Sequence, residues 1–338
     1  MRPTIPLYYV LGSALCLLSP ACKPSASNQA VADPSPMAEQ VAPEKHGSNQ
    51  NLTEVKLARL QEQDGQNTPE ALLQLGRTYL EGLGVTKDDA KAAEYFRKAA
   101  DMGNAKAENN LGLMYATGQG VKKDSDEALK WLRAAATRGN IDAQENLGLM
   151  LVTGDDLPKD IKEARTWYEK AAEQGSLPSQ LWLGKALFLG DSGLDKDYVA
   201  AARWLMPAAE KGDAWAQNAM GMIYERPLGV KRDVKGAEKW FVLAAEQGDV
   251  KAQANLGLLI FSNTGLPVDK VAGYKWLALA SEHDEATAFN ALKEIVLGLS
   301  PEVIAEGRRQ VEEYKAKHQL PAKDSTSAAA QTLPTTRE

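Results

Sequence analysis

Side chains that commonly carry chemistry are few and scattered in this sequence. The three histidines, His46, His283 and His318, lie far apart, and no two of them have the spacing of a helical metal site. The sequence contains neither the G-x-S-x-G nor the S-x-x-K motif of serine nucleophiles, and no G-x-x-x-x-G-K-[ST] phosphate loop. This pattern predicts a protein with no catalytic site, no metal and no other cofactor.

Adjacent carboxylates are the remaining candidates for acid–base chemistry. Asp88-Asp89 and Asp155-Asp156 could each share a proton as a catalytic dyad does. Both pairs, however, lie at predicted helix starts. Acidic residues there accept hydrogen bonds from free backbone amides and complement the helix dipole. We therefore interpret these carboxylates as structural.

The helix positions follow from an internal repeat. AENNLGLMYATGQG begins at Ala107, and the similar AQENLGLMLVTGDD begins at Ala143. Four kinds of residue recur in register, at steps of 36 or 37 residues. They are a first glycine (Gly76, Gly112, Gly148, Gly184, Gly221, Gly257), an aspartate (Asp88, Asp124, Asp160, Asp197, Asp233, Asp269), an aromatic residue (Tyr95, Trp131, Trp167, Trp204, Trp240, Trp276) and a second glycine (Gly103, Gly139, Gly175, Gly212, Gly248).

Each repeat is predicted to form two helices. In helix A, Ala107, Leu111 and Met114 follow the helical period, and in helix B Ala128, Trp131 and the two alanines after Ala134 form an apolar stripe. The aspartate suits the start of helix B, and the second glycine suits its end. The first glycine lies inside helix A, which we attribute to the close approach of another helix. One repeat cannot bury both helices, so the sequence predicts an all-α fold, an α/α solenoid of six repeats over residues 67–283.

The pattern LGxxY…GxGVxxDxxxAxxWxxxAAxxG resembles the Sel1-like repeat family, which is related to the tetratricopeptide repeats. Leu151, Leu187 and Ile260 depart from its tyrosine, and GDDLPKD and GLPVDK depart from its GVxxD loop. The resemblance implies a scaffold that assembles complexes, takes part in signalling or mediates host–bacterium contacts. It also implies an alternative, an envelope enzyme or enzyme regulator acting on cell-wall material.

By the same resemblance, helix A would line a concave groove that binds a protein or peptide. Candidate groove residues are the amides Asn110 and Asn146, the cations Arg77 and Lys185, and Trp182, which stands where other repeats have asparagine. Trp182 would be an exposed anchor or would pack on an adjacent repeat, and the asparagines would bind a partner or serve the fold. Trp215, at a helix start, is interpreted as a packing residue.

The N-terminus has the features of an export signal. Residues 1–21 combine an arginine, an apolar core and small residues at Ser19 and Ala21. Cys22 follows, and the segment resembles a bacterial lipobox, although Ser19 replaces the usual leucine. We expect a lipid on Cys22 that anchors the protein in the cell envelope, on the periplasmic side of the outer membrane in a Gram-negative host. The alternative is ordinary cleavage with a free cysteine.

Other segments flank the repeats. Residues 22–51 are polar and rich in proline and serine, which predicts a disordered tether. We expect an N-terminal capping helix over 52–66, C-terminal capping helices over 284–318, with Ser300 as the N-cap of the last one, and a disordered tail over 319–338. The net charge of −6 provides no basic face, so nucleic acid is not an expected partner.

The lipid anchor can be tested by replacing one atom. In Cys22→Ser, the sulfur that would carry the lipid is lost, and two acyl chains are what make such anchoring stable. We expect the variant to move from the membrane pellet to the soluble fraction and to lose incorporation of labelled fatty acid. Unchanged fractionation and labelling would exclude Cys22 as the lipidation site.

Overall fold

The computed structural model describes residues 68–154, 156–191, 193–262, 268–283 and 285–319. The predicted signal segment, Cys22, the tether, the N-terminal capping helix and almost all of the predicted tail lie outside this range. The part described is helical, with no strand assigned in it. It divides into two compact units, of which the first ends at Ser179 and the second begins at Gln180, and each unit is described by itself.

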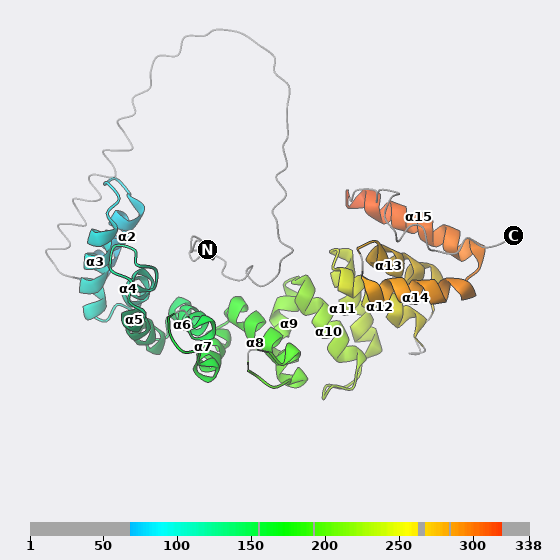
Figure 1. Ribbon diagram of the computed structural model, residues 1–338, viewed down its shortest axis with the longest axis horizontal. Coiled ribbons are helices and arrows are strands. Elements are labelled where there is room, and N and C mark those ends of the chain that lie inside the picture. The colour runs from blue at the N-terminus through cyan, green and yellow to red at the C-terminus, as the bar shows by residue number, and fades with distance from the viewer. Residues whose placement is uncertain (1–67, 155, 192, 263–267, 284, 320–338) are drawn as a thin grey trace, which may run out of the picture. The chain divides into compact units, whose positions relative to one another are not determined.

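Unit 1 contains three helix pairs. The first helix of each pair, an A helix, is α2 (Pro69–Glu81), α4 (Ala105–Thr117) or α6 (Ile141–Thr153). The second, a B helix, is α3 (Asp89–Asp101), α5 (Ser125–Thr137) or α7 (Ile161–Glu173). Within the unit each helix contacts the next along the chain, and consecutive pairs lie side by side (Figure 1). The predicted two-helix repeat is therefore confirmed.

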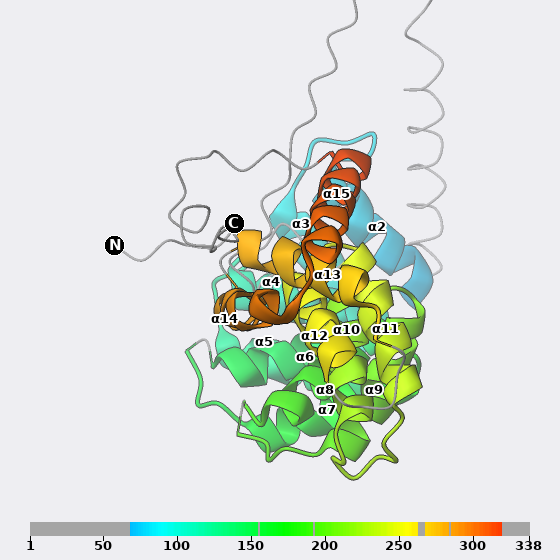
Figure 2. The same cartoon turned by 90° about the vertical axis from the view of Figure 1, so that its right-hand side faces the viewer.

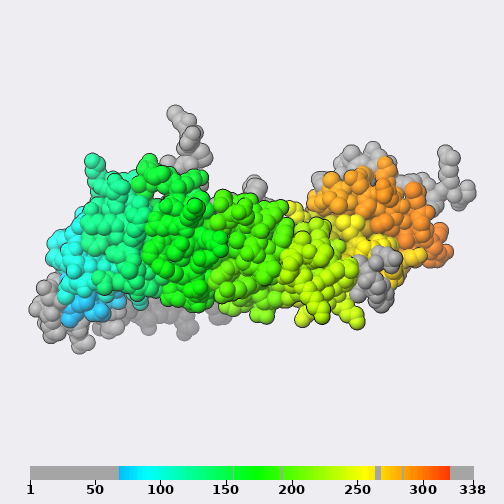
Figure 3. Space-filling view, turned by 90° about the horizontal axis from the view of Figure 1, so that it is seen from below, coloured from blue at the N-terminus to red at the C-terminus, as the bar shows by residue number. Residues whose placement is uncertain are grey.

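Unit 2 continues the pattern and then departs from it. Its A helices are α8 (Leu177–Leu189, which begins just before the boundary), α10 (Ala214–Glu225) and α12 (Val250–Phe261), and its B helices are α9 (Tyr198–Glu210), α11 (Val234–Glu246) and α13 (Lys270–Glu282). They are followed by α14 (Ala286–Ile295), the short 3₁₀ helix η1 (Val296–Gly298) and α15 (Pro301–Lys317). In the space-filling view the pairs within each unit form contiguous bands of successive colour (Figure 3).

The aspartate column caps the B helices as predicted. Each of the six side chains accepts a hydrogen bond from a backbone amide in the first helical turn, as Asp160 does from Glu163 N at 2.9 Å. The second glycine lies just beyond the end of the B helix with positive φ, for example 85° at Gly139. A residue with a Cβ would be strained there, which accounts for glycine in this column.

The first glycine marks the tightest contact of each repeat. A Cβ added at Gly221 would lie 2.5 Å from the ring of Phe241, and one at Gly184 would lie 2.4 Å from Leu205. The close approach that the sequence predicted is thus real. It is made mainly by a large side chain of the B helix of the same repeat. Six such residues fill this position: Phe96, Leu132, Tyr168, Leu205, Phe241 and Leu277.

The aromatic column lies in the packing between neighbouring repeats. Trp131 is buried in a cluster with Leu72, Phe96 and other residues of the preceding repeat, and Trp276 packs in the same way with Phe241. The indole N–H of Trp131 donates to Glu127 at 3.0 Å. Trp240 and Tyr95 are only half-buried, so the column is structural but not uniformly enclosed.

A polar column that was not recognised in the sequence joins three A helices, α6, α10 and α12, to the preceding B helix. Gln144, Gln217 and Gln253 each donate from Nε2 to a carbonyl near the end of that B helix, at 3.1, 2.9 and 3.2 Å. In α4 the same position holds Glu108, which is 2% exposed and pairs instead with Arg138, at the end of the following B helix α5, at 3.1 Å. The three glutamine bonds satisfy carbonyls that a helix end leaves without an intrahelical partner.

The last helix closes unit 2 by packing across α13 (Figure 2). Ser300 caps it as predicted, accepting from Val303 N at 3.4 Å. Gly307 lies against the Tyr274 ring, and the Tyr314 hydroxyl donates to the Ala245 carbonyl at 3.0 Å. Lys315, only 7% exposed, is paired with Glu282 and Glu312 at 3.1 and 2.9 Å. Tertiary contacts therefore hold α15 in place along its length.

Candidate functional site

Each A helix has one face that packing leaves at least partly accessible, which we call the A face. On α6 it carries Asp142, Asn146, Leu149 and Thr153, whose steps of four, three and four residues place them on one side of a helix. Leu149 is 47% exposed. The equivalent positions are Lys106, Asn110, Leu113 and Thr117 on α4, and Glu70, Gln74, Arg77 and Glu81 on α2.

The predicted groove asparagines lie on this face, and one of them has a structural bond. Asn146 Nδ2 donates to Asn109 Oδ1 at 3.0 Å, which links α6 to α4. Unit 2 repeats the arrangement, because Asn255 of α12 donates to Asn218 of α10 at 2.9 Å. Asn110 is half-buried. Asn146 therefore has a structural role, which was one of the two alternatives predicted for it. Its partner Asn109 was not recognised from the sequence.

The two predicted cations differ in their surroundings. The Arg77 side chain is 48% exposed and lies 3.8 Å from Glu81. Exposed pairs of this kind contribute about 0–1 kcal/mol, so Arg77 can exchange Glu81 for another partner. The Lys185 ammonium lies 5.0 Å from the ring centre of Trp215, within the range of a cation–π contact.

Of the two tryptophans outside the repeating aromatic column, Trp182 is the more buried. Trp182 is 9% exposed, so its indole offers little surface to a partner, and the packing alternative accounts for it better. Trp215, interpreted from sequence as a packing residue, is half-buried beside Lys185. Its ring packs edge-to-face against the Phe188 ring, with the ring centres 5.7 Å apart and an interplanar angle of 82°. Phe188 also meets Tyr198 at 5.6 Å. Sequence spacing predicts where a tryptophan lies along a helix, but it does not predict the side-chain rotamer that decides how far the indole is buried.

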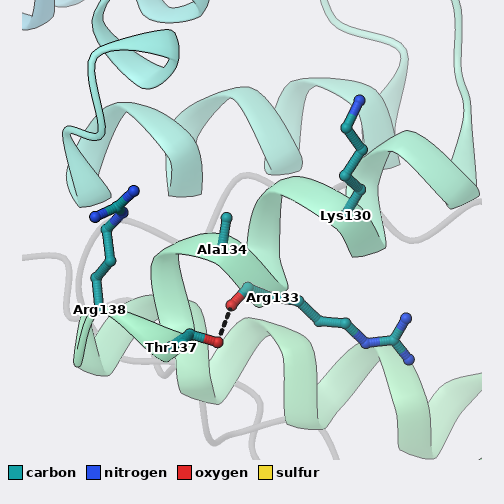
Figure 4. Close-up of a pocket in the computed structure, with 5 residues that line it drawn as sticks. All are labelled: Lys130, Arg133, Ala134, Thr137 and Arg138. Carbon is teal, nitrogen blue, oxygen red and sulfur yellow. Dashed lines mark hydrogen bonds between the residues drawn. The ribbon is translucent and has the colours of Figure 1, made fainter.

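An open depression on the outer side of α5 is lined by Lys130, Arg133, Ala134, Thr137 and Arg138 (Figure 4). Its three basic side chains point in different directions, and each already has an acidic partner. The Arg133 guanidinium donates to Glu163 and lowers the pKa of that carboxyl, and the Lys130 ammonium likewise lowers the pKa of Glu127. The three basic side chains therefore do not converge to form an anion-binding site.

The carboxylate pairs considered for catalysis have other roles where the structure describes them. Asp88 accepts from Lys91 N at 3.0 Å, Asp89 lies 3.3 Å from Lys87, and Asp156 lies 2.6 Å from Lys123. In the described ranges, no group of three or more histidine, cysteine, aspartate or glutamate residues could hold a metal ion. The helices described there also include none with the length and apolar character needed to cross a bilayer.

The geometry of the repeat matches that of known proteins. A model of the Sel1 repeat family matches residues 69–104, 105–140, 141–176, 177–213, 216–249 and 250–285. The chain therefore belongs to the Sel1 repeat family, whose members are typically scaffolds for protein interactions. The match begins two residues later and ends two residues later than the repeat array expected from the sequence.

Two solved structures give the comparison more detail. A protective antigen of uropathogenic Escherichia coli, c5321, is 33% identical with a TM-score of 0.56, and the alignment covers 78% of this chain and 58% of that one. A Sel1 repeat protein from Oxalobacter formigenes is 35% identical with a TM-score of 0.48, over 69% of this chain and 96% of that one. The chain thus spans little more than half of the first relative. The sequence matches none of the curated proteins compared with it.

The structural role of the asparagine pair predicts a specific stability effect. Asn146→Ala leaves Asn109, which is 6% exposed, without its donor, so we expect a loss of about 1–3 kcal/mol in the free energy of unfolding. Gln74→Ala changes an exposed residue at the same position of α2 and should stay within about 0.5 kcal/mol. The measurement is urea unfolding followed by circular dichroism. Equal stability of Asn146→Ala and wild type would show that the bond adds nothing.

Proposed function

We propose that this protein is a non-catalytic adaptor of the bacterial cell envelope that binds a protein or peptide through its A faces. The observation that supports the proposal is the unequal use of the two sides of the helix pairs. On the B helices, tryptophans pack between repeats, and neighbouring basic side chains cover their rings, as Lys275 does for Trp276 at 3.7 Å. On the A helices, half-buried amides and apolar side chains recur in register, as a surface for an extended partner requires.

The proposal includes export and a lipid on Cys22, with residues 22–51 as a tether between membrane and repeats. It rests on the apolar segment and small residues before Cys22. A tethered scaffold with no catalytic role needs only to hold its partner near the membrane, where a modest affinity is strengthened by the high local concentration.

Photo-cross-linking in living cells tests the adaptor role directly. A photoreactive amino acid is placed at Leu149 or Met222 on the A faces and, as a matched control, at Leu243 on the B helix α11. Leu149 and Leu243 are 47% and 40% exposed, so both can accept the probe without disturbing the core. We expect discrete adducts with a protein from the A-face positions and none from Leu243.

Two results would contradict the proposal. The absence of adducts from both Leu149 and Met222 would remove the evidence for a partner. Adducts only from Leu243 would assign binding to the B helices. If adducts form from the A-face positions, mass spectrometry of the cross-linked protein would identify the partner.

A further inference from the structure

The A faces of the two units differ in charge. In unit 1, the A-face positions of α2, α4 and α6 carry the acids Glu70, Glu81 and Asp142 and the cations Arg77 and Lys106. In unit 2, α8, α10 and α12 carry the cations Lys185 and Lys251 and the acid Glu225, and Asp213 and Asp249 cap the starts of α10 and α12. Glu225 lies at the end of α10, 3.8 Å from Arg226. The acidic residues of the unit 2 A helices are therefore confined to the helix ends, although the chain has a net charge of −6.

Apolar side chains occupy the surface that the charges leave. Leu181, Lys185 and Phe188 follow steps of four and three residues and share one side of α8. On α10 and α12, Trp215, Met222 and Leu258 are likewise half-buried. The Lys185–Trp215 and Phe188–Trp215 contacts join α8 to α10. We call these six residues the apolar A face of unit 2, although Leu181 and Phe188 each lie one residue before an A-face position of α8.

Lys185 is the cation within this apolar surface. Its ammonium lies over the Trp215 ring, and the side chain is half-buried, so one side of the charge faces the aromatic ring and leaves the other side for another acceptor. The carboxylates at the starts of α10 and α12, Asp213 and Asp249, already cap these helices by accepting from Ala216 N and Ala252 N, each at 2.7 Å. Ion pairs in apolar surroundings are stronger than exposed ones, because water screens them less.

We propose that the apolar A face of unit 2 binds a peptide segment in which an acidic residue is flanked by apolar ones, with the carboxylate on Lys185 and the apolar side chains on Phe188, Trp215 and Met222. The inference rests on the adaptor function and adds the chemistry of the partner. Charge complementarity selects this partner, because the A-face positions of unit 2 carry Lys185 and Lys251 and no acid, whereas three A-face positions of unit 1 are acidic. A single central cation does not suit nucleic acid, whose binding requires several phosphate contacts.

The test uses a defined probe and the whole chain. The probe is a short fluorescein-labelled peptide, blocked at both ends, that alternates glutamate with leucine and phenylalanine. Two comparison peptides carry glutamine or lysine in place of glutamate. Fluorescence anisotropy should show that the glutamate peptide binds at least about tenfold more tightly than the glutamine peptide, since one charge-assisted bond contributes about that factor. Of the glutamate and glutamine peptides, added salt should weaken the binding of the glutamate peptide only.

Matched variants assign the binding to Lys185. Lys185→Glu should lower the affinity for the glutamate peptide by about tenfold or more. Lys235→Glu, an equivalent reversal of an exposed lysine on the B helix α11, should change the affinity for the glutamate peptide less than twofold. Lys185→Gln serves if the reversal lowers the helical circular-dichroism signal, and it should still weaken the glutamate peptide about tenfold.

Several results would overturn the inference. They are equal affinities for the glutamate and glutamine peptides, equal effects of the two reversals, or no binding of the glutamate peptide. A dimer of the free chain that Lys185→Glu dissociates would assign this face to a second copy and would also overturn it. If photo-cross-links still form at Leu149 or Met222 in any of these cases, the adaptor function stands and only the proposed partner chemistry falls.

Discussion

The contact between a glycine of each A helix and a large side chain of its B helix is the constraint on which the structure depends. At Gly221 the ring of Phe241 comes so near that a Cβ would lie 2.5 Å away. Glycine inside a helix costs about 1 kcal/mol relative to alanine. Burial of a whole leucine, tyrosine or phenylalanine side chain offsets that cost in every repeat, because such burial contributes about 1.5–3 kcal/mol.

This contact also determines which surfaces remain available. With one side of the A helix held against its own B helix, the glutamine column turns toward the preceding repeat, where Gln217 binds the Ala209 carbonyl. The side left over is the A face. Its chemistry is not needed for packing within a pair, so it can differ between repeats without loss of the fold. This explains why Arg77, Leu149 and Lys185, which occupy the same position of their A helices, differ in type.

Periodic features were predictable from the sequence and individual orientations were not. The aspartate caps and the second glycine have local causes, so their spacing was enough to place the helices. Ser300 was recognisable as an N-cap for the same reason. The glutamine column was missed because its bonds reach a carbonyl of another helix, which spacing does not reveal. For Trp182 the sequence left both an exposed and a packed environment open, because burial depends on side-chain rotamers and on neighbouring residues, as the contact between Trp215 and Phe188 illustrates. The division between Ser179 and Gln180 left no mark in the repeat period.

A double-mutant cycle at Gly221 and Phe241 tests the central contact most directly. Gly221→Ala alone forces a methyl group into the Phe241 ring, and Phe241→Ala alone leaves a cavity in a fully buried position, a change that typically costs about 3–5 kcal/mol. Combined, the new methyl group has room and partly fills that cavity. Urea unfolding should therefore show the double variant to be more stable than the sum of the single effects by at least about 1 kcal/mol. Additive losses would contradict the account, because they would show that the glycine is not required by the side chain it faces.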